Sequence, residues 1–212
     1  MTGELHITDA VERDDLGAFT ARVVRLDPAG VVRLRARHGR VEAWATTPFD
    51  VLVTRSVRGE LEPADLTVAG RELLAALAVQ RDERVDPGAA TTVGWRSALP
   101  PEDGWHEVEE IPVDVLEGLS EHGLQLAREH GDPHGEPPAG LLDQIVLTAT
   151  GAGLEVGVAL RLLFALSGMG FLGDGSQDRV RVSATASWVR LDARFGAVVR
   201  RRYPSQLTLV PR

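Results

Sequence analysis

One segment of the sequence concentrates residues that could bind a metal ion. It reads EHGLQLAREHGDPHGE and spans residues 121–136. His130 and His134 are four residues apart, and on a continuous helix two such rings could share a zinc ion. A glycine and a proline between them break the helix. A loop site of His130, Asp132 and His134 stays open, and with it a metal-dependent enzyme that uses residues 122–136. The alternative is a polar loop with exposed histidines.

A second set of candidates consists of arginines on predicted strands. The six candidates for contacts with an anion or a nucleic acid are Arg33, Arg35, Arg37, Arg200, Arg201 and Arg202. The first three alternate with apolar residues, so the two-residue period of a strand puts them on one face. The chain has only five Phe, four Trp and one Tyr, which leaves few platforms for stacked bases. A solvated outer face of a sheet is therefore the favoured alternative.

Composition excludes several other chemistries. The chain has no cysteine and no lysine, and its 23 basic residues are all arginine. Disulfides, thiolate nucleophiles, Schiff-base lysines and the GxxxxGK[ST] phosphate loop are therefore absent. Gly168-x-Gly170-x-x-Gly173 follows a predicted helix rather than a strand, which does not suit a dinucleotide site. No catalytic constellation is visible, and we expect a protein that is not an enzyme and has no cofactor.

The overall balance of residues is that of a folded soluble protein. Of the 212 residues, 43% are hydrophobic and 25% are charged. The net charge of −8 is uneven, because residues 20–58 and 179–212 are rich in arginine. The longest strongly apolar run, Leu162 to Leu166, is too short to cross a bilayer, and no signal-like segment follows Met1. These features predict a cytoplasmic protein without a membrane contact.

The sequence contains nearly the same strand-to-helix transition twice. LTVAGRELLAAL occupies residues 66–77, and VGVALRLLFAL occupies residues 156–166. Without a gap, Val68, Ala69, Arg71, Leu73 and Ala75 align with Val158, Ala159, Arg161, Leu163 and Ala165. Each copy precedes a polar turn and a run that ends on Trp95 or Trp188. The matched order predicts an internal duplication, with units 1–99 and 100–212 that meet at a stretch rich in Pro and Gly.

Each unit is predicted to contain strands, one long helix and one short helix. In the first unit we expect strands at 4–7, 32–36, 41–45, 51–57, 66–68 and 89–95, a helix capped by Asp9, and a second helix from Ala69. In the second unit we expect strands at 108–111, 145–150, 154–158 and 182–188, a helix capped by Asp114 that runs to about His130, and the short helix of the repeat. The fold class is therefore α+β: two related units, each a mostly antiparallel sheet with two helices on one face.

This order resembles a known family, the DNA sliding clamps that serve as polymerase processivity factors. The closest likeness lies in VVRLRARHGRVEAWATTPFDVLVTRSV (31–57) and ELEPADLTVAGRELLAAL (60–77), which are similar to the strands and the helix entry of a clamp domain. The chain end LTLVPR (207–212) also looks like the final strand of clamps. The resemblance covers most of residues 4–96 and, more loosely, 105–211. It implies a clamp-like arrangement of the two units.

The charge on the predicted helices departs from the clamp pattern. A clamp lines its ring with basic helices, because neutralised phosphates supply its grip on DNA. The long helix of the second unit carries Arg128 against Asp114, Glu117, Glu121 and Glu129. Such a lumen would be neutral to acidic, so encirclement of DNA is disfavoured. We expect a non-enzymatic interaction or scaffold protein that binds protein partners and self-associates through edge strands. A DNA-associated clamp paralogue and the metal-dependent enzyme are the alternatives.

Overall fold

The computed structural model of the chain describes residues 3–80, 82–130, 139–173 and 177–202. The first unit contains β1 (Glu4–His6), α1 (Ala10–Leu26), β2 (Val31–Arg37), β3 (Arg40–Thr46), β4 (Leu52–Arg58), β5 (Glu60–Glu62), β6 (Asp65–Ala69), α2 (Gly70–Val79) and β7 (Arg84–Val85). The second contains β8 (His106–Pro112), α3 (Val113–His130), α4 (Ala139–Leu142), β9 (Ile145–Gly151), β10 (Leu154–Ala159), α5 (Leu160–Gly168), β11 (Arg179–Ala184), β12 (Trp188–Ala193) and β13 (Gly196–Arg201).

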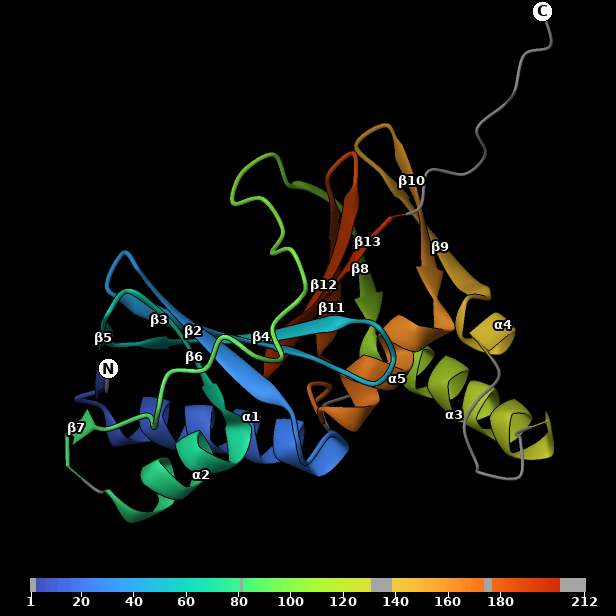
Figure 1. The fold of residues 1–212 in the computed structure, drawn as a ribbon. Coiled ribbons are helices and arrows are strands. Elements are labelled where there is room, and N and C mark those ends of the chain that lie inside the picture. Colours follow the sequence, from blue (N-terminus) through green and yellow to red (C-terminus); the bar gives the residue numbers. More distant parts are fainter. Residues whose placement is uncertain (1–2, 81, 131–138, 174–176, 203–212) are drawn as a thin grey trace, which may run out of the picture.

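One antiparallel sheet of eight strands runs through both units (Figure 1). Its order is β6-β2-β3-β4-β13-β12-β11-β8, so the first four strands come from the first unit and the other four from the second. The seam is the pairing of β4 with β13, where Val53 lies opposite Val198. The predicted α+β fold with two related units and mostly antiparallel strands is confirmed. The structure adds that the strands of the two units join edge to edge.

The long and short helices lie on one side of this sheet (Figure 1). Helix α1 packs against α2 in the first unit, and α3 packs against α5 in the second. A single hydrophobic core extends through both units beneath the sheet. The rings of Phe19 from α1 and Phe171 after α5 stack with centroids 6.3 Å apart. The opposite side of the sheet, which we call the outer face, carries none of the helices that the structure describes.

The predicted N-cap residue of α1 is confirmed. Asp9 is the N-cap residue, and its Oδ1 accepts a hydrogen bond from the Val11 amide at 2.9 Å. This satisfies one of the amides that a helix start leaves without an intrahelical partner. Leu16, Phe19 and Val23 are buried at helical spacing. Helix α3 starts differently from the prediction, because it begins at Val113 directly after β8 and Asp114 lies inside its first turn.

The two copies of the repeat fold alike. Strand β6 leads into α2 through Ala69, and β10 leads into α5 through Ala159. Both alanines are N-cap residues in extended conformation, and neither helix start has a side-chain cap. Leu73 and Leu163 are both buried in the core. The repeat in the sequence therefore corresponds to a repeated strand-to-helix unit.

The strands predicted to end on Trp95 and Trp188 are wrong. Residues 89–95 form isolated bridges in place of a strand, one of them between Ala90 and Val68 of β6. Gly88 before this run and Gly94 within it have positive φ, which interrupts an extended backbone. In the second unit β11 ends at Ala184, because the hydroxyl of Thr185 accepts from the amide of Trp188 at 3.0 Å and forms a turn. The two tryptophans are not equivalent in the fold. They instead meet in one cluster on the outer face.

Both end strands of the large sheet have neighbours. Next to β6, the amide of Thr91 donates to the carbonyl of Thr67 at 2.8 Å. Next to β8 lies the β9–β10 hairpin, and its Gly151 is so close that a Cβ there would be 1.9 Å from the Val108 carbonyl oxygen. Strands β5, β1 and β7 form a separate small sheet in the first unit. The predicted final strand LTLVPR falls outside the described residues.

Candidate functional site

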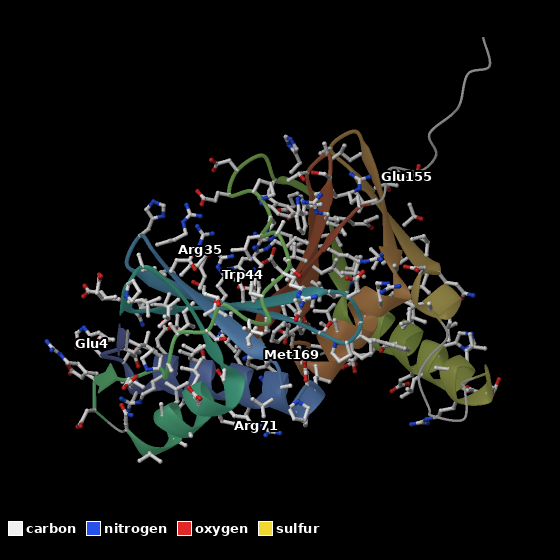
Figure 2. The ribbon with its side chains drawn as sticks, in the orientation of Figure 1. Glu4, Arg35, Trp44, Arg71, Glu155 and Met169 are labelled. Carbon is white, nitrogen blue, oxygen red and sulfur yellow. The ribbon has the colours of Figure 1, made fainter. Side chains whose placement is uncertain are left out.

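The three arginines of β2 share the outer face, as their alternation predicted. Arg33 donates two hydrogen bonds to the carboxylate of Asp65, at 2.8 and 2.7 Å. Hydrogen bonding to Asp65 raises the pKa of Arg33, against the opposing effect of desolvation. Arg35 lies 3.5 Å from the same carboxylate, and Arg37 forms an ion pair with Glu102. Figure 2 shows Arg35 on the side of the sheet away from α1 and α2. These arginines already have acidic partners within the chain.

The linker between the units, residues 86–105, crosses the outer face and supplies one of those partners. Glu102 belongs to this linker, and so do Trp95, Leu99 and Trp105. The three apolar side chains pack against a cluster of Trp44, Leu52, Trp188 and Val199 on the sheet. The ring of Trp95 also lies 5.7 Å from the guanidinium carbon of Arg33. The outer face is therefore partly covered, and the tryptophans pack on the sheet there.

The arginines at the end of β13 differ from one another in their contacts. Arg200 is 11% exposed and has Asp143 at 3.2 Å and Asp50 at 3.7 Å. The guanidinium of Arg201 lies 5.0 Å from the ring of Trp188. Arg202 donates to two backbone carbonyls, those of Thr185 at 3.1 Å and Glu155 at 2.9 Å. Sequence reasoning grouped these residues as adjacent arginines and could not distinguish these roles.

A cavity of about 230 Å³, which we call the junction pocket, lies where the two units and the linker meet. It is lined by Thr46, Thr47, Asp50, Val51 and Leu52 of the first unit, Ser97 and Ala98 of the linker, and Trp188, Val199, Arg200 and Arg201 of the second unit. Of its apolar lining residues, Val51, Leu52, Trp188 and Val199 are buried, whereas Ala98 is exposed. The pocket therefore combines polar lining residues and two arginines with a wall of four buried apolar side chains.

A larger cavity of about 640 Å³, the hairpin pocket, adjoins the junction pocket. It lies between the β9–β10 hairpin and the ends of β12 and β13, and it shares Asp50, Arg200 and Arg201 with the junction pocket. Its further charged residues are Asp143, Glu155, Arg161 and Arg202. Ile145 at its rim is 58% exposed, which is unusual for a large aliphatic side chain. The two pockets form one candidate site across the seam of the sheet.

A buried arginine that sequence reasoning missed fixes the floor of this site. Arg161 of α5 is 7% exposed, and it donates to Asp143 Oδ1 at 2.9 Å and to the Phe49 carbonyl at 2.6 Å. Asp143 in turn contacts Arg200, so helix, hairpin and sheet are linked to the β3–β4 turn. A single arginine within the apolar run VALRLLFAL was the available signal, because a buried arginine needs a partner.

The proposed metal ligands lie mostly outside the described residues. Asp132 and His134 belong to the undescribed segment 131–138, and of His130 only the backbone, at the end of α3, is described. Within the described ranges no group of three or more His, Asp or Glu side chains is arranged to hold a metal ion. The metal site therefore stays a prediction, and the junction and hairpin pockets are the site that the structure defines.

Two family models together match almost the whole chain. Residues 1–97 match a domain of unknown function, DUF8010, and residues 100–205 match another, DUF8185. The second match spans half of the chain. The chain belongs to the DUF8185 family. Among curated proteins, none matches it.

Solved structures of DNA polymerase sliding clamps resemble this DUF8185 protein over its full length. The clamp from Caulobacter crescentus is 14% identical with a TM-score of 0.56, and the match covers 100% of this chain and 69% of the clamp. The clamp from Bacillus subtilis is 13% identical with a TM-score of 0.56, covering 99% and 68%. The clamp from Bartonella birtlesii is 14% identical with a TM-score of 0.56, also covering 99% and 68%. The DUF8185 protein therefore has a sliding-clamp-like fold, which confirms the resemblance seen in the sequence. None of the helices in the described ranges is long and apolar enough to span a bilayer.

Proposed function

We propose that this chain is a non-enzymatic interaction protein that holds a segment of a protein partner in the junction and hairpin pockets. The observation that carries the proposal is the preformed apolar wall of the junction pocket, built by Val51, Leu52, Trp188 and Val199 from two units. Binding sites are typically concave, largely apolar and formed before the ligand arrives. Hot spots of protein interfaces likewise place an apolar anchor in a desolvated pocket.

The size of the junction pocket favours a peptide side chain over a whole small molecule. Its volume of about 230 Å³ is below the roughly 300–1,000 Å³ of pockets that enclose drug-sized ligands. The adjoining hairpin pocket is open and lined by charged residues, so it suits the residues that flank an anchor. The exposed Ile145 offers a second apolar contact at its rim. The Bartonella clamp was crystallised bound to griselimycin, so a protein of this fold accepts a ligand.

The charge of the helix side supports a protein partner over encircled DNA. On α3 the exposed charged residues are Asp114, Glu117, Glu121, Arg128 and Glu129, so acidic residues outnumber basic ones. An acidic surface repels phosphates, whereas a clamp needs basic side chains to displace counterions from DNA. The six candidate arginines lie on strands or directly after one, away from this helix. DNA therefore stays the disfavoured partner, and self-association stays a prediction that light scattering can test.

Peptide display on the full chain tests the proposal. A random-peptide library is selected on the wild-type protein, and the enriched peptides are measured against Ala98→Trp, which places an indole in the junction pocket from the exposed linker. We expect the affinity to fall by about tenfold or more, as for the loss of an interface anchor. Ala21→Trp, at an exposed position of α1, is the matched control and should leave affinity unchanged. No enrichment, or equal binding by the two variants, would overturn the proposal.

A further inference from the structure

Two of the four arginines in the hairpin pocket are neutralised by carboxylates of the chain. Arg161 and Arg200 share Asp143, with nitrogen–oxygen distances of 2.8 and 3.2 Å. Asp50 lies 3.9 Å from Arg161 and 3.7 Å from Arg200. Two guanidinium groups and two carboxylates therefore form a balanced network, which ties α5 and β13 to the turn between β3 and β4. This network is structural and leaves no net charge for a ligand.

The other two arginines of the pocket have neutral partners. Arg201 is exposed and stacks on the ring of Trp188, and Arg202 is held by the carbonyls of Thr185 and Glu155. Among the residues that the structure describes, neither is paired with a carboxylate. A cation on an aromatic ring, or one hydrogen-bonded to carbonyls, keeps its full charge. The exposed Glu155 carboxylate is the opposing charge at this end of the pocket.

We propose that the partner segment is acidic next to its apolar anchor, and that its carboxylates bind Arg201 and Arg202. This inference rests on the proposed function, because it assigns the charge of the segment that the two pockets would hold. Arg201 lines both pockets, so a carboxylate on it lies beside an apolar side chain seated against Trp188. Guanidinium groups bind carboxylates with paired, charge-assisted hydrogen bonds.

Charge complementarity favours this occupant over others. The chain carries a net charge of −8, so a site with two uncompensated arginines stands out from an acidic surface. Such a local patch selects partners by charge and speeds their association, while like charge elsewhere suppresses unspecific contacts. A nucleic acid would also match the charge, but it has no apolar side chain for the junction pocket. We therefore favour a peptide, and DNA binding becomes an outcome of the test.

Three sets of synthetic peptides test the inference on the full chain. Each keeps the apolar anchor of a peptide selected by display and flanks it with Asp and Glu, with Ser, or with Arg. Fluorescence polarisation gives the affinities at low and high salt. We expect the acidic set to bind about fivefold or more above the serine set at low salt, and the difference to shrink as salt screens the charges. The basic set should bind weakest.

Charge-removing variants distinguish contacts with Arg201 and Arg202 from the effect of the overall charge of the protein. Arg201→Gln, alone and with Arg202→Gln, should abolish the preference for acidic flanks over serine flanks. Arg179→Gln removes an equal charge from an exposed position of β11 and should keep the preference.

The outcomes distinguish this inference from the proposed function. If all three sets bind wild type equally and Ala98→Trp still blocks them, the acidic partner is wrong and the pocket stands. If no set binds through the junction pocket, both proposals fail. A short oligonucleotide that competes with the acidic set through Arg201 would replace the peptide by a nucleic acid and overturn the inference.

Discussion

The two short helices of the repeat, α2 and α5, share an aligned arginine, leucine and alanine but have very different surroundings. In α2 the buried residues are Gly70, Leu73 and Leu77, and the other residues of the helix are half-buried or exposed. In α5 every residue from Leu160 to Leu166 is buried. Helix α2 packs on α1, β2 and β6, whereas α5 is enclosed by α3, α4, β10 and β13. One amphipathic pattern thus supports both an outer helix and a central one.

The aligned arginines show what this difference means. Arg71 is exposed on α2, and Figure 2 shows it on the side of that helix away from the sheet. Arg161 is 7% exposed and joins the network beneath the hairpin pocket. An arginine that is solvated in one copy is thus a structural cation in the other. The two copies of the strand-to-helix unit therefore pack alike, while the place of each copy within the fold sets the role of its side chains.

The largest effects are expected at the shared leucines. Leu73→Ala and Leu163→Ala each remove a fully buried side chain, and each should lower the free energy of unfolding by about 3 kcal/mol, within the range for such cavities. Urea denaturation of both variants measures this. Comparable losses are expected if the two helices pack alike. A loss at one site with a neutral change at the other would break the comparison of the units.

Substitution of the two aligned arginines should affect stability differently in α2 and α5. Arg161→Leu removes the charged hydrogen bonds to Asp143 and the Phe49 carbonyl, and we expect a loss of about 2 kcal/mol in the free energy of unfolding. Arg71→Leu alters an exposed position and should stay within about 0.5 kcal/mol. The same denaturation assay compares them. Equal effects would mean that Arg161 is no more than a solvated side chain.

The smallest effect is expected at the helix starts. Ala69→Ser adds a hydroxyl at an N-cap residue that makes no side-chain hydrogen bond. It should raise the free energy of unfolding by about 0.5–1 kcal/mol. Ala159→Asp, at the equivalent but buried position, should instead be destabilising because a carboxylate loses its hydration there. Thermal unfolding of both variants shows whether each substitution raises or lowers the stability of the protein. A gain at both positions would show that Ala159 is less enclosed than the structure indicates.

Local patterns predicted the elements that depend on neighbours in the sequence. The Asp9 cap, the helical spacing of Leu16 and Phe19, and the alternation along β2 each follow from backbone geometry within a few residues. The predicted strand 89–95 failed because a strand needs a partner along its length, and the residues near Ala90 form only isolated bridges. Alternation placed Arg33 on the outer face, but its pairing with Asp65 comes from the next strand in the sheet.

The candidate site was beyond reach of such patterns. Its walls come from the β3–β4 turn, the linker, and strands β12 and β13. The turn lies more than a hundred residues before these two strands. Only the pairing of β4 with β13 brings Leu52 and Val199 opposite one another. Register between distant strands depends on how whole faces bury each other, which no short segment encodes.

The amino-acid sequence alone determined that this chain contains a repeated strand-to-helix unit, because Val, Leu and Ala at fixed spacing bury the same stripe wherever the helix lies. It also determined that thiol and lysine chemistry are absent. The tertiary structure decided which copy is enclosed, and therefore that Arg161 is buried while Arg71 is solvated. The physical reason is that helix spacing specifies one buried face, whereas burial of the remaining faces depends on the elements that pack around it.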